Sequence, residues 1–452
     1  MYTRLCSSLL FPLHERLKGH HSVALRKELE RSQWLPADHL VDLQVSRLKA
    51  FLTQIGTRVP YYRDLFARLE FRPECVQSIA DIATLPLLDK ATIRAGRDQM
   101  LSTAAGKVLQ YNTGGSSGEP LVFFMGMARV SHDVAAKWRA TRWWGVDIGD
   151  AEVVLWGSPV ELDKQDRVKA IRDRVFRSHL LPAFEMSERQ MDEYLGALQR
   201  LRPRMLFGYA SALALLASHA ERRGRDMTGI GAAVAFVTGE TLYAHQRAVI
   251  ERVFGVPAAN GYGSRDAGFI AHQCPSGSLH ISAEHIVVEL LDESGSPVPL
   301  GKQGEIVVTH LATGDFPFVR YRTGDMAVAE AGPCACGRGL PVLREVLGRS
   351  TDFIRTPSGN VMHALALIYE IRDKPGVKAF KFVQDRDYSV ALLVTAGCEF
   401  TADVERQVQA GLARRLGDQL PVSVHRVDHI QPEKSGKYRY VVSRVDECGE
   451  AS

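Results

Sequence analysis

The chain has 452 residues, of which 45% are hydrophobic and 24% are charged, and its formal net charge is +4. This length exceeds what one hydrophobic core normally serves, so two or more domains are expected. The balance of 56 basic against 52 acidic residues argues against nucleic acid as the main partner. The sequence contains no run of about 18 apolar residues, so no membrane span is predicted.

Helical patterns dominate roughly the first 100 residues. Next come a strand, a glycine-rich loop and a second strand over 111–125, and a helix over 131–145. Strands and helices then alternate, with strands expected over 152–156, 205–209 and 232–237 and helices over 187–201 and 212–223. This alternation predicts an α/β fold in which parallel strands bind ligands at their carboxyl ends.

The pattern changes from residue 285 onward. Strands over 285–291 and 305–311, separated by a turn, predict an antiparallel β segment. The last hundred residues predict a small α+β domain with a hairpin around 357–359, strands near 378–384, 388–394 and 422–428, and a helix over 402–416. We therefore expect a large N-terminal α/β domain over 1–347 and a small α+β domain over 348–452, joined by a hinge at 349–352.

Cysteine usage indicates a reducing compartment. Seven cysteines are spread along the chain: Cys6, Cys75, Cys274, Cys334, Cys336, Cys398 and Cys448. The apolar stretch at 9–13 contains Pro12 and no small-residue cleavage site follows it, so we do not interpret it as a signal peptide. A cytoplasmic protein is expected, in which clustered cysteines bind metal or do chemistry rather than form disulfides.

The stretch 111–120, with the sequence YNTGGSSGEP, is the most informative single motif. Glycine tolerates positive φ and allows close approach to the main chain, so such a loop can turn its N–H groups toward an anion. Hydroxyl side chains add donors for phosphate oxygens. The loop is not a Walker A motif, because Gly118 is followed by Glu119. On its own it fits a phosphate cradle and a flexible surface turn about equally.

Five further motifs follow this loop in order: Gly239-Glu240, Gly261-Tyr262-Gly263-Ser264-Arg265-Asp266, Tyr321-Arg322-Thr323-Gly324-Asp325, Gly348-Arg349-Ser350-Thr351-Asp352 and Ser435-Gly436-Lys437-Tyr438-Arg439. The series resembles the adenylate-forming (AMP-binding) superfamily, and more narrowly its phenylacetate–CoA ligase and capsule-biosynthesis branch. The resemblance covers essentially the whole chain. Each motif is weak alone, and their shared order carries the interpretation.

The resemblance implies an ATP site with a role for each motif. The phosphates would be held by Thr113, Gly114, Gly115, Ser116, Ser117 and Gly118. Gly239, Glu240 and the ring of Tyr262, with Gly263 and Ser264, would line the nucleotide. Asp325 would bind the ribose hydroxyls, with Arg349 nearby. Asp266 would hold Mg²⁺, a cation that prefers carboxylate oxygen and shares the ATP phosphates.

The resemblance also implies a mobile catalytic lysine. Lys437 would reach between the incoming carboxylate and the α-phosphate, where a cation stabilises the charge that develops. Asp352 would act as the hinge about which the C-terminal domain moves. The alternatives without a catalytic role are a surface lysine at 437 and a helix cap at 352. Likewise, Tyr262 could be a core aromatic and Asp325 a turn residue.

The third motif departs from the family pattern, which usually reads Tyr-Gly-x-Thr-Glu. Arg265 replaces a hydroxyl residue expected near the α-phosphate; its guanidinium could bind phosphate and take part in catalysis, or it could point elsewhere. Asp266 is one methylene shorter than the usual glutamate, so its contact with Mg²⁺ could pass through water.

A second metal site is predicted from Cys274, His280, Cys334 and Cys336, a Cys₃His set typical of structural zinc. His272 is a rival for His280, and the alternative is ordinary buried thiols beside a surface histidine. Zinc here would tie the segment after Tyr262-Gly263 to the segment after Asp325.

The resemblance implies that a small carboxylic acid is joined to AMP with release of pyrophosphate and then transferred to coenzyme A. An aryl or arylalkyl acid is expected, and the aromatic candidates for its pocket are Trp138, Trp143, Trp144, Trp156 and Tyr209. Core packing is the commoner role for such residues. Transfer to an amine, a hydroxyl or a carrier-protein thiol in polysaccharide or natural-product biosynthesis stays open. So do a non-catalytic ATP-binding role and a homodimer.

Overall fold

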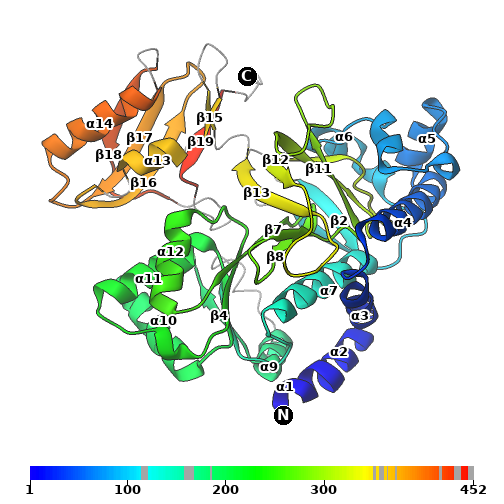
Figure 1. The fold of residues 1–452 in the computed structure, drawn as a ribbon, viewed down its shortest axis with the longest axis horizontal. Coiled ribbons are helices and arrows are strands. Elements are labelled where there is room, and N and C mark those ends of the chain that lie inside the picture. Colours follow the sequence, from blue (N-terminus) through cyan, green and yellow to red (C-terminus); the bar gives the residue numbers. More distant parts are fainter. Residues whose placement is uncertain are drawn as a thin grey trace. The chain divides into compact units, whose positions relative to one another are not determined.

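The structure is a computed structural model that describes residues 1–112, 121–156, 167–183, 186–349, 353–355, 361–363, 365–371, 374–416, 420–431 and 439–445. The chain divides into two compact units, Met1–Leu347 and Gly348–Ser452 (Figure 1). The first is built on a large sheet with helices on its faces, and the second has its own small sheet. The predicted fold class, α/β with a small α+β domain, is confirmed. Among the described residues, we find no helix with the length and apolar character needed to cross a membrane.

Helices form the first hundred residues, as predicted. They are α1 (Tyr2–Leu5), the π-helical turn η1 (Cys6–Leu10), α2 (Phe11–Leu17), α3 (Ser22–Ser32), α4 (Ala37–Arg58), α5 (Pro60–Arg68), η2 (Pro73–Cys75), η3 (Ile79–Thr84) and α6 (Lys90–Met100). A hairpin of β1 (Val108–Asn112) and β2 (Val122–Gly126) follows, and then α7 (Met127–Trp143). In this hairpin Asn112 pairs with Val122, so the strands flank the glycine-rich loop.

The large sheet has eleven strands in the order β10-β11-β12-β13-β9-β8-β7-β6-β5-β3-β4. Its parallel half consists of β3 (Glu152–Trp156), β4 (Ser178–Pro182), β5 (Met205–Gly208), β6 (Val234–Thr238) and β7 (Ala258–Ser264). The intervening helices are α9 (Arg167–Phe176), α10 (Glu188–Leu201), α11 (Ala210–Arg222), η4 (Thr228–Ile230) and α12 (Ala244–Phe254). α10 begins with the predicted capping box, in which Ser187 and Gln190 satisfy each other's backbone N–H groups.

Both faces of the parallel half are covered, which explains its all-apolar strands. Every residue of β6 is buried. Leu206 and Val237 pack under α10–α12, whereas Phe207 and Phe236 pack with Ala140 of α7 on the opposite face. α10–α12 and α7 therefore lie on the two sides of the sheet (Figure 1).

The antiparallel half consists of β8 (Gly268–Gln273), β9 (Leu279–Ile281), β10 (Ile286–Leu291), β11 (Gln303–His310), β12 (Tyr321–Glu330) and β13 (Val342–Arg349). β10 and β11 pair antiparallel, as the turn between them predicts. β7 pairs antiparallel with β8, so the switch from parallel to antiparallel falls at β7.

The second unit contains β14 (Phe353–Arg355), β15 (Val361–His363), α13 (Leu365–Ile371), β16 (Val377–Gln384), β17 (Val390–Ala396), α14 (Ala402–Leu416), β18 (Val422–Arg426) and β19 (Val441–Ser443). Its four-stranded sheet has the order β18-β17-β16-β19, and β14 and β15 form a separate hairpin. Both the hairpin and α14 were predicted, whereas α13 and β19 were not.

Candidate functional site

Three of the sequence motifs meet where the parallel strands β6 and β7 end. These strands pair in parallel, so Gly239-Glu240 after β6 and the segment 262–264 of β7 leave the sheet at the same edge. The hydroxyl of Tyr262 donates a 2.8 Å hydrogen bond to Oδ2 of Asp325 on β12. Burial, followed by the charge of Asp325, raises the pKa of Tyr262 well above its ordinary value, so its hydroxyl stays protonated. The motifs thus converge where α/β sheets bind ligands.

Aromatic side chains line the same edge of the sheet. Trp156 ends β3 and Tyr209 follows β5, and their rings stack at 4.2 Å between centroids. Gly239 has a φ of +81°, and a Cβ atom there would lie 3.2 Å from the Tyr209 ring and 3.4 Å from Trp156. Glycine is therefore required by both conformation and space. The other aromatic candidates lie on or directly after α7: Trp138, Trp143 and Trp144.

Glu240 is tied to a neighbouring helix. Its Oε2 accepts a 3.0 Å hydrogen bond from the backbone N–H of Ser211, in the first turn of α11. A carboxylate suits that position because the first N–H groups of a helix lack intrahelical partners. This contact fixes the loop after β6 relative to α11.

Asp266 is a buried carboxylate with two hydroxyl donors. Oδ1 accepts from the Ser264 hydroxyl and Oδ2 from the Tyr321 hydroxyl, both at 2.5 Å. Burial opposes ionisation, but these hydrogen bonds and the charge of Lys90 together hold the pKa of Asp266 below its ordinary value. The side chain is therefore ionised at neutral pH, the form that binds a divalent cation.

Arg265 contacts the hairpin that carries the glycine-rich loop. Its Nη1 donates a 3.1 Å hydrogen bond to the carbonyl oxygen of Asn112, the last residue of β1. Arg129, near the start of α7, donates to the carbonyl oxygens of Asp266 and Arg265 at 3.2 and 3.3 Å and pairs with Asp133 at 3.1 Å. Arg265 thus joins the turn after β7 to the end of β1, and Arg129 joins the same turn to α7, which follows β2.

Sequence reasoning missed Arg129 and gave no role to Tyr321. Tyr321 lies inside a recognised motif, so its proximity to the site had a signal. Arg129 lies outside every motif, and nothing in its neighbours points to the turn it holds.

Several expected site residues lie outside the described residues. They are Thr113, Gly114, Gly115, Ser116, Ser117 and Gly118 of the loop, Asp352 of the hinge, and Lys437. Arg349 is described as the last residue of β13 by its backbone alone.

Four side chains from three segments form the Cys₃His cluster. Cys274 follows β8, His280 is in β9, and Cys334 and Cys336 lie between β12 and β13. Their ligand atoms all lie within 4.8 Å of one another. The Sγ atoms of Cys274 and Cys334 are 3.7 Å apart, and Cys336 Sγ is 3.2 Å from His280 Nε2. Four ligand atoms this close together could hold a metal ion.

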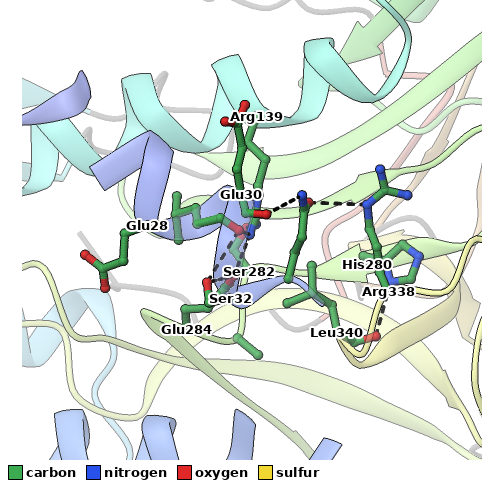
Figure 2. Close-up of polar contacts among 12 residues, drawn as sticks. Glu28, Glu30, Ser32, Arg139, His280, Ser282, Glu284, Arg338 and Leu340 are labelled. Carbon is green, nitrogen blue, oxygen red and sulfur yellow. Dashed lines mark hydrogen bonds and ion pairs between the residues drawn. The ribbon is translucent and has the colours of Figure 1, made fainter. Parts of the chain in front are cut away.

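The protonation pattern of His280 suits a metal ligand. Its Nδ1 lies 3.1 Å from the carbonyl oxygen of Leu340, which can only accept, so Nδ1 carries the proton and Nε2 offers a lone pair (Figure 2). Burial lowers the pKa of His280, which keeps the ring neutral. Burial raises the pKa of Cys274 to about 11, so metal binding would release its proton.

His272, the rival ligand, lies elsewhere. It is opposite His280 on the neighbouring strand, but its ring packs on Phe269 and Phe236. It is not part of the cluster that the described residues form with Cys274. Burial lowers its pKa to about 3, so His272 is a neutral core side chain.

A buried polar network supports the strand that carries His280 (Figure 2). Arg139 of α7 contacts Glu284 at 2.6 Å, and neither side chain is exposed. Ser32 of α3 donates to the same carboxylate at 2.9 Å. Arg338, two residues after Cys336, contacts Gln33 at 3.3 Å. The network joins α3 and α7 to the segments on both sides of the Cys₃His cluster.

Comparison with known proteins finds relatives over most of the chain. A family described as the CapK C-terminal domain matches residues 354–444. Protein CapK of Staphylococcus aureus is 23% identical over 440 residues, which cover 95% of this chain and 94% of CapK. The phenylacetate-coenzyme A ligase of Thermus thermophilus is 26% identical over 340 residues, which cover 72% of this chain and 74% of the ligase. The chain is homologous to CapK and the phenylacetate-CoA ligases.

Solved structures agree on the fold. A 2-hydroxyisobutyryl-CoA ligase in complex with 2-HIB-AMP matches with a TM-score of 0.73 and 18% identity, over 92% of this chain and 91% of the ligase. The same ligase in complex with 2-HIB-AMP and CoA matches with a TM-score of 0.63. Both units of the chain therefore have the fold of the adenylate-forming superfamily, the resemblance predicted from the sequence.

Proposed function

We propose that the chain is an AMP-forming acid–thiol ligase, which activates a carboxylic acid with ATP and transfers the acyl group to coenzyme A. The observation that carries this proposal is the joining of the turn after β7, with its ionised Asp266, to Asn112 at the base of the glycine-rich loop. Homology to phenylacetate-CoA ligases and the fold of a ligase solved with 2-HIB-AMP and CoA support the same activity.

In the first half-reaction a carboxylate oxygen attacks the α-phosphorus of ATP. The bond from that phosphorus to the bridging oxygen breaks, and pyrophosphate leaves with the electron pair. Residues 113–118 would hold the departing phosphates. Asp325 would accept hydrogen bonds from the ribose hydroxyls, with its position fixed by Tyr262, whose ring offers a face to the adenine.

Mg²⁺ fits the carboxylate of Asp266. This group is ionised, and its oxygens, which accept the hydroxyls of Ser264 and Tyr321, have further lone pairs. Its neighbour Arg265 contacts Asn112 at the base of the loop. When bound there, Mg²⁺ would supply charge neutralisation for the phosphates. We place Arg265 as a support of the loop, because its guanidinium contacts the backbone of Asn112.

In the second half-reaction the sulfur of coenzyme A attacks the acyl carbon, the thiol proton is lost, and AMP leaves. We propose that the unit Gly348–Ser452 moves about Asp352 between the two steps and carries Lys437 to and from the α-phosphate. The existence of a separate compact C-terminal unit supports this division of labour.

An aryl or arylalkyl acid is the substrate class that we propose. The stacked pair of Trp156 and Tyr209 lies at the ends of adjacent parallel strands, next to Gly239. Flat aromatic walls favour planar apolar groups. We also propose that the Cys₃His cluster holds structural zinc, because four ligands fill its tetrahedral shell and leave no open position.

Product analysis tests the proposal. With ATP, Mg²⁺, coenzyme A and a panel of aryl and aliphatic acids, we expect AMP, pyrophosphate and one aryl-CoA thioester by mass spectrometry. Formation of ADP would contradict the proposal. If acyl-AMP accumulates and no thioester forms, an amine, a hydroxyl or a carrier-protein thiol is the acceptor, and screening these three classes identifies it.

A further inference from the structure

The first helical arm, α1–η1–α2 (Tyr2–Leu17), exposes an apolar stripe. Six of the thirteen exposed large hydrophobic side chains among the described residues lie within the first 17 positions. Two of them are Met1 and Tyr2, and the other four recur every fourth residue, which places those four on one face of a helix: Leu5, Leu9, Leu13 and Leu17. The last three are 58%, 54% and 79% exposed, so this face has no partner among the described residues.

The opposite face of the arm is fixed to the protein. The ring of Phe11 packs edge-on against Trp138 and Phe176, with centroids 5.0 and 5.4 Å apart. The hydroxyl of Tyr2 donates to the carbonyl oxygen of Val175 at 2.8 Å. A folded, anchored helical arm therefore presents the leucines in a constant direction over about 24 Å of length. Figure 1 shows the arm at the N-terminal end of the chain.

The exposed charged side chains of the arm and of the residue after it are all basic: Arg4, Arg16 and Lys18. On the neighbouring α9, Arg174 is exposed, and the partly exposed Asp173 is paired with Arg172. The only acidic side chain of the arm, Glu15, is 3% exposed and accepts hydrogen bonds from the interior. The exposed surface of the arm is thus apolar along its centre and cationic along its margin.

We propose that this arm docks on an anionic lipid surface, with its axis in the plane of the membrane and its leucines at the boundary between headgroups and acyl chains. An amphipathic helix with a basic margin binds in this way through apolar burial and attraction to anionic lipid. A second copy of the chain fits poorly: antiparallel pairing of two stripes would bring Arg4 against Arg16, and parallel pairing would bring Arg4 against Arg4. Neither arrangement supplies an acidic partner.

Vesicle flotation with the full chain tests the proposal. We expect binding to vesicles of 70% phosphatidylcholine and 30% phosphatidylglycerol, and much weaker binding to phosphatidylcholine alone. Replacing both Leu9 and Leu13 with Ser should lower the partition coefficient at least about tenfold, because apolar burial is lost. The matched control replaces Leu215 and Leu300, which are also exposed, and should bind as the wild type does.

The charge requirement is tested separately. Each basic residue near an anionic surface strengthens binding about fivefold, so Arg16→Gln with Lys18→Gln should weaken it about 25-fold at moderate salt. Arg222→Gln with Arg225→Gln, exposed residues far along the chain, form the control and should have no effect.

Three results would overturn the proposal. They are no binding to anionic vesicles, equal binding to both lipid compositions, and equal loss in the variants and their matched controls. Sedimentation velocity tests whether a second copy of the chain covers the stripe instead. A dimer that dissociates when Leu9 and Leu13 are replaced would show that it does.

Discussion

Replacing Tyr321 with Phe removes one of the two hydroxyl donors to the buried carboxylate of Asp266 and leaves the ring in place. The hydroxyl lies 2.5 Å from Oδ2, and Tyr321 is fully buried. A hydrogen bond to a charged group contributes about 1.5–3 kcal/mol. Since one pKa unit corresponds to about 1.36 kcal/mol, the pKa of Asp266 should rise by about one to two units.

The rise should appear in the pH dependence of adenylation. The wild-type pKa of Asp266 is lowered, so its ionised form persists into acid. In Tyr321→Phe, the acid side of the profile of kcat/KM for MgATP should move upward by about one to two pH units. This profile comes from the exchange of labelled pyrophosphate into ATP in the presence of the carboxylic acid substrate, measured from pH 4.5 to 8.

The free energy of unfolding should also depend on the pKa of Asp266. A lowered folded pKa contributes stability that is present above the unfolded value, about 3.9, and is lost as pH falls through the folded value. The free energy of unfolding of Tyr321→Phe should therefore fall below that of wild type at pH 7, and the gap should narrow in acid.

Tyr62→Phe is the matched control, because Tyr62 is also buried and its hydroxyl donates to a backbone carbonyl oxygen, that of Pro317. Its pH profile should match that of wild type. An unshifted profile in Tyr321→Phe, or equal shifts in both variants, would refute the reasoning about Asp266.

Three further predictions concern the metal cluster, the lysine and the buried ion pair. Cys336→Ser should lose the single equivalent of zinc that elemental analysis of the wild type is expected to find, whereas the exposed Cys398→Ser should keep it. Lys437→Ala should cripple adenylation but spare thioester formation from supplied acyl-AMP, and equal loss of both steps would contradict the domain movement. Glu284→Ala should lower the urea-derived free energy of unfolding by about 3–5 kcal/mol, because it leaves a buried arginine unpaired. The exposed Glu193→Ala should change that value little.

Much of the fold was predictable because local signals and burial agree. The apolar run at 232–237 predicted a strand buried on both faces, and β6 is buried throughout. The Ser187 capping box predicted the start of α10. The sequence did not predict β4 and α9, since their mixed composition lacks a clear period, nor the three-residue β19, which is too short to carry one.

The site was predictable as a set of motifs but not as a set of contacts. Motif order placed Tyr262 and Asp325 in one site, and their hydrogen bond agrees with that placement. Sequence alone left two directions open for Arg265, because a long flexible side chain can reach phosphate or backbone, and in the structure it contacts Asn112. Sequence favoured His280 over its rival His272, and the ring environment and the contact with Cys336 separate the two in the structure.

Exchange of labelled pyrophosphate into ATP that requires a carboxylic acid substrate, with coenzyme A withheld, tests the central claim most directly. The account predicts exchange with at least one aryl or arylalkyl acid, dependent on Mg²⁺ and lost in Asp266→Ala. Absence of exchange across a broad panel of carboxylic acids, with folded wild-type protein, would contradict it.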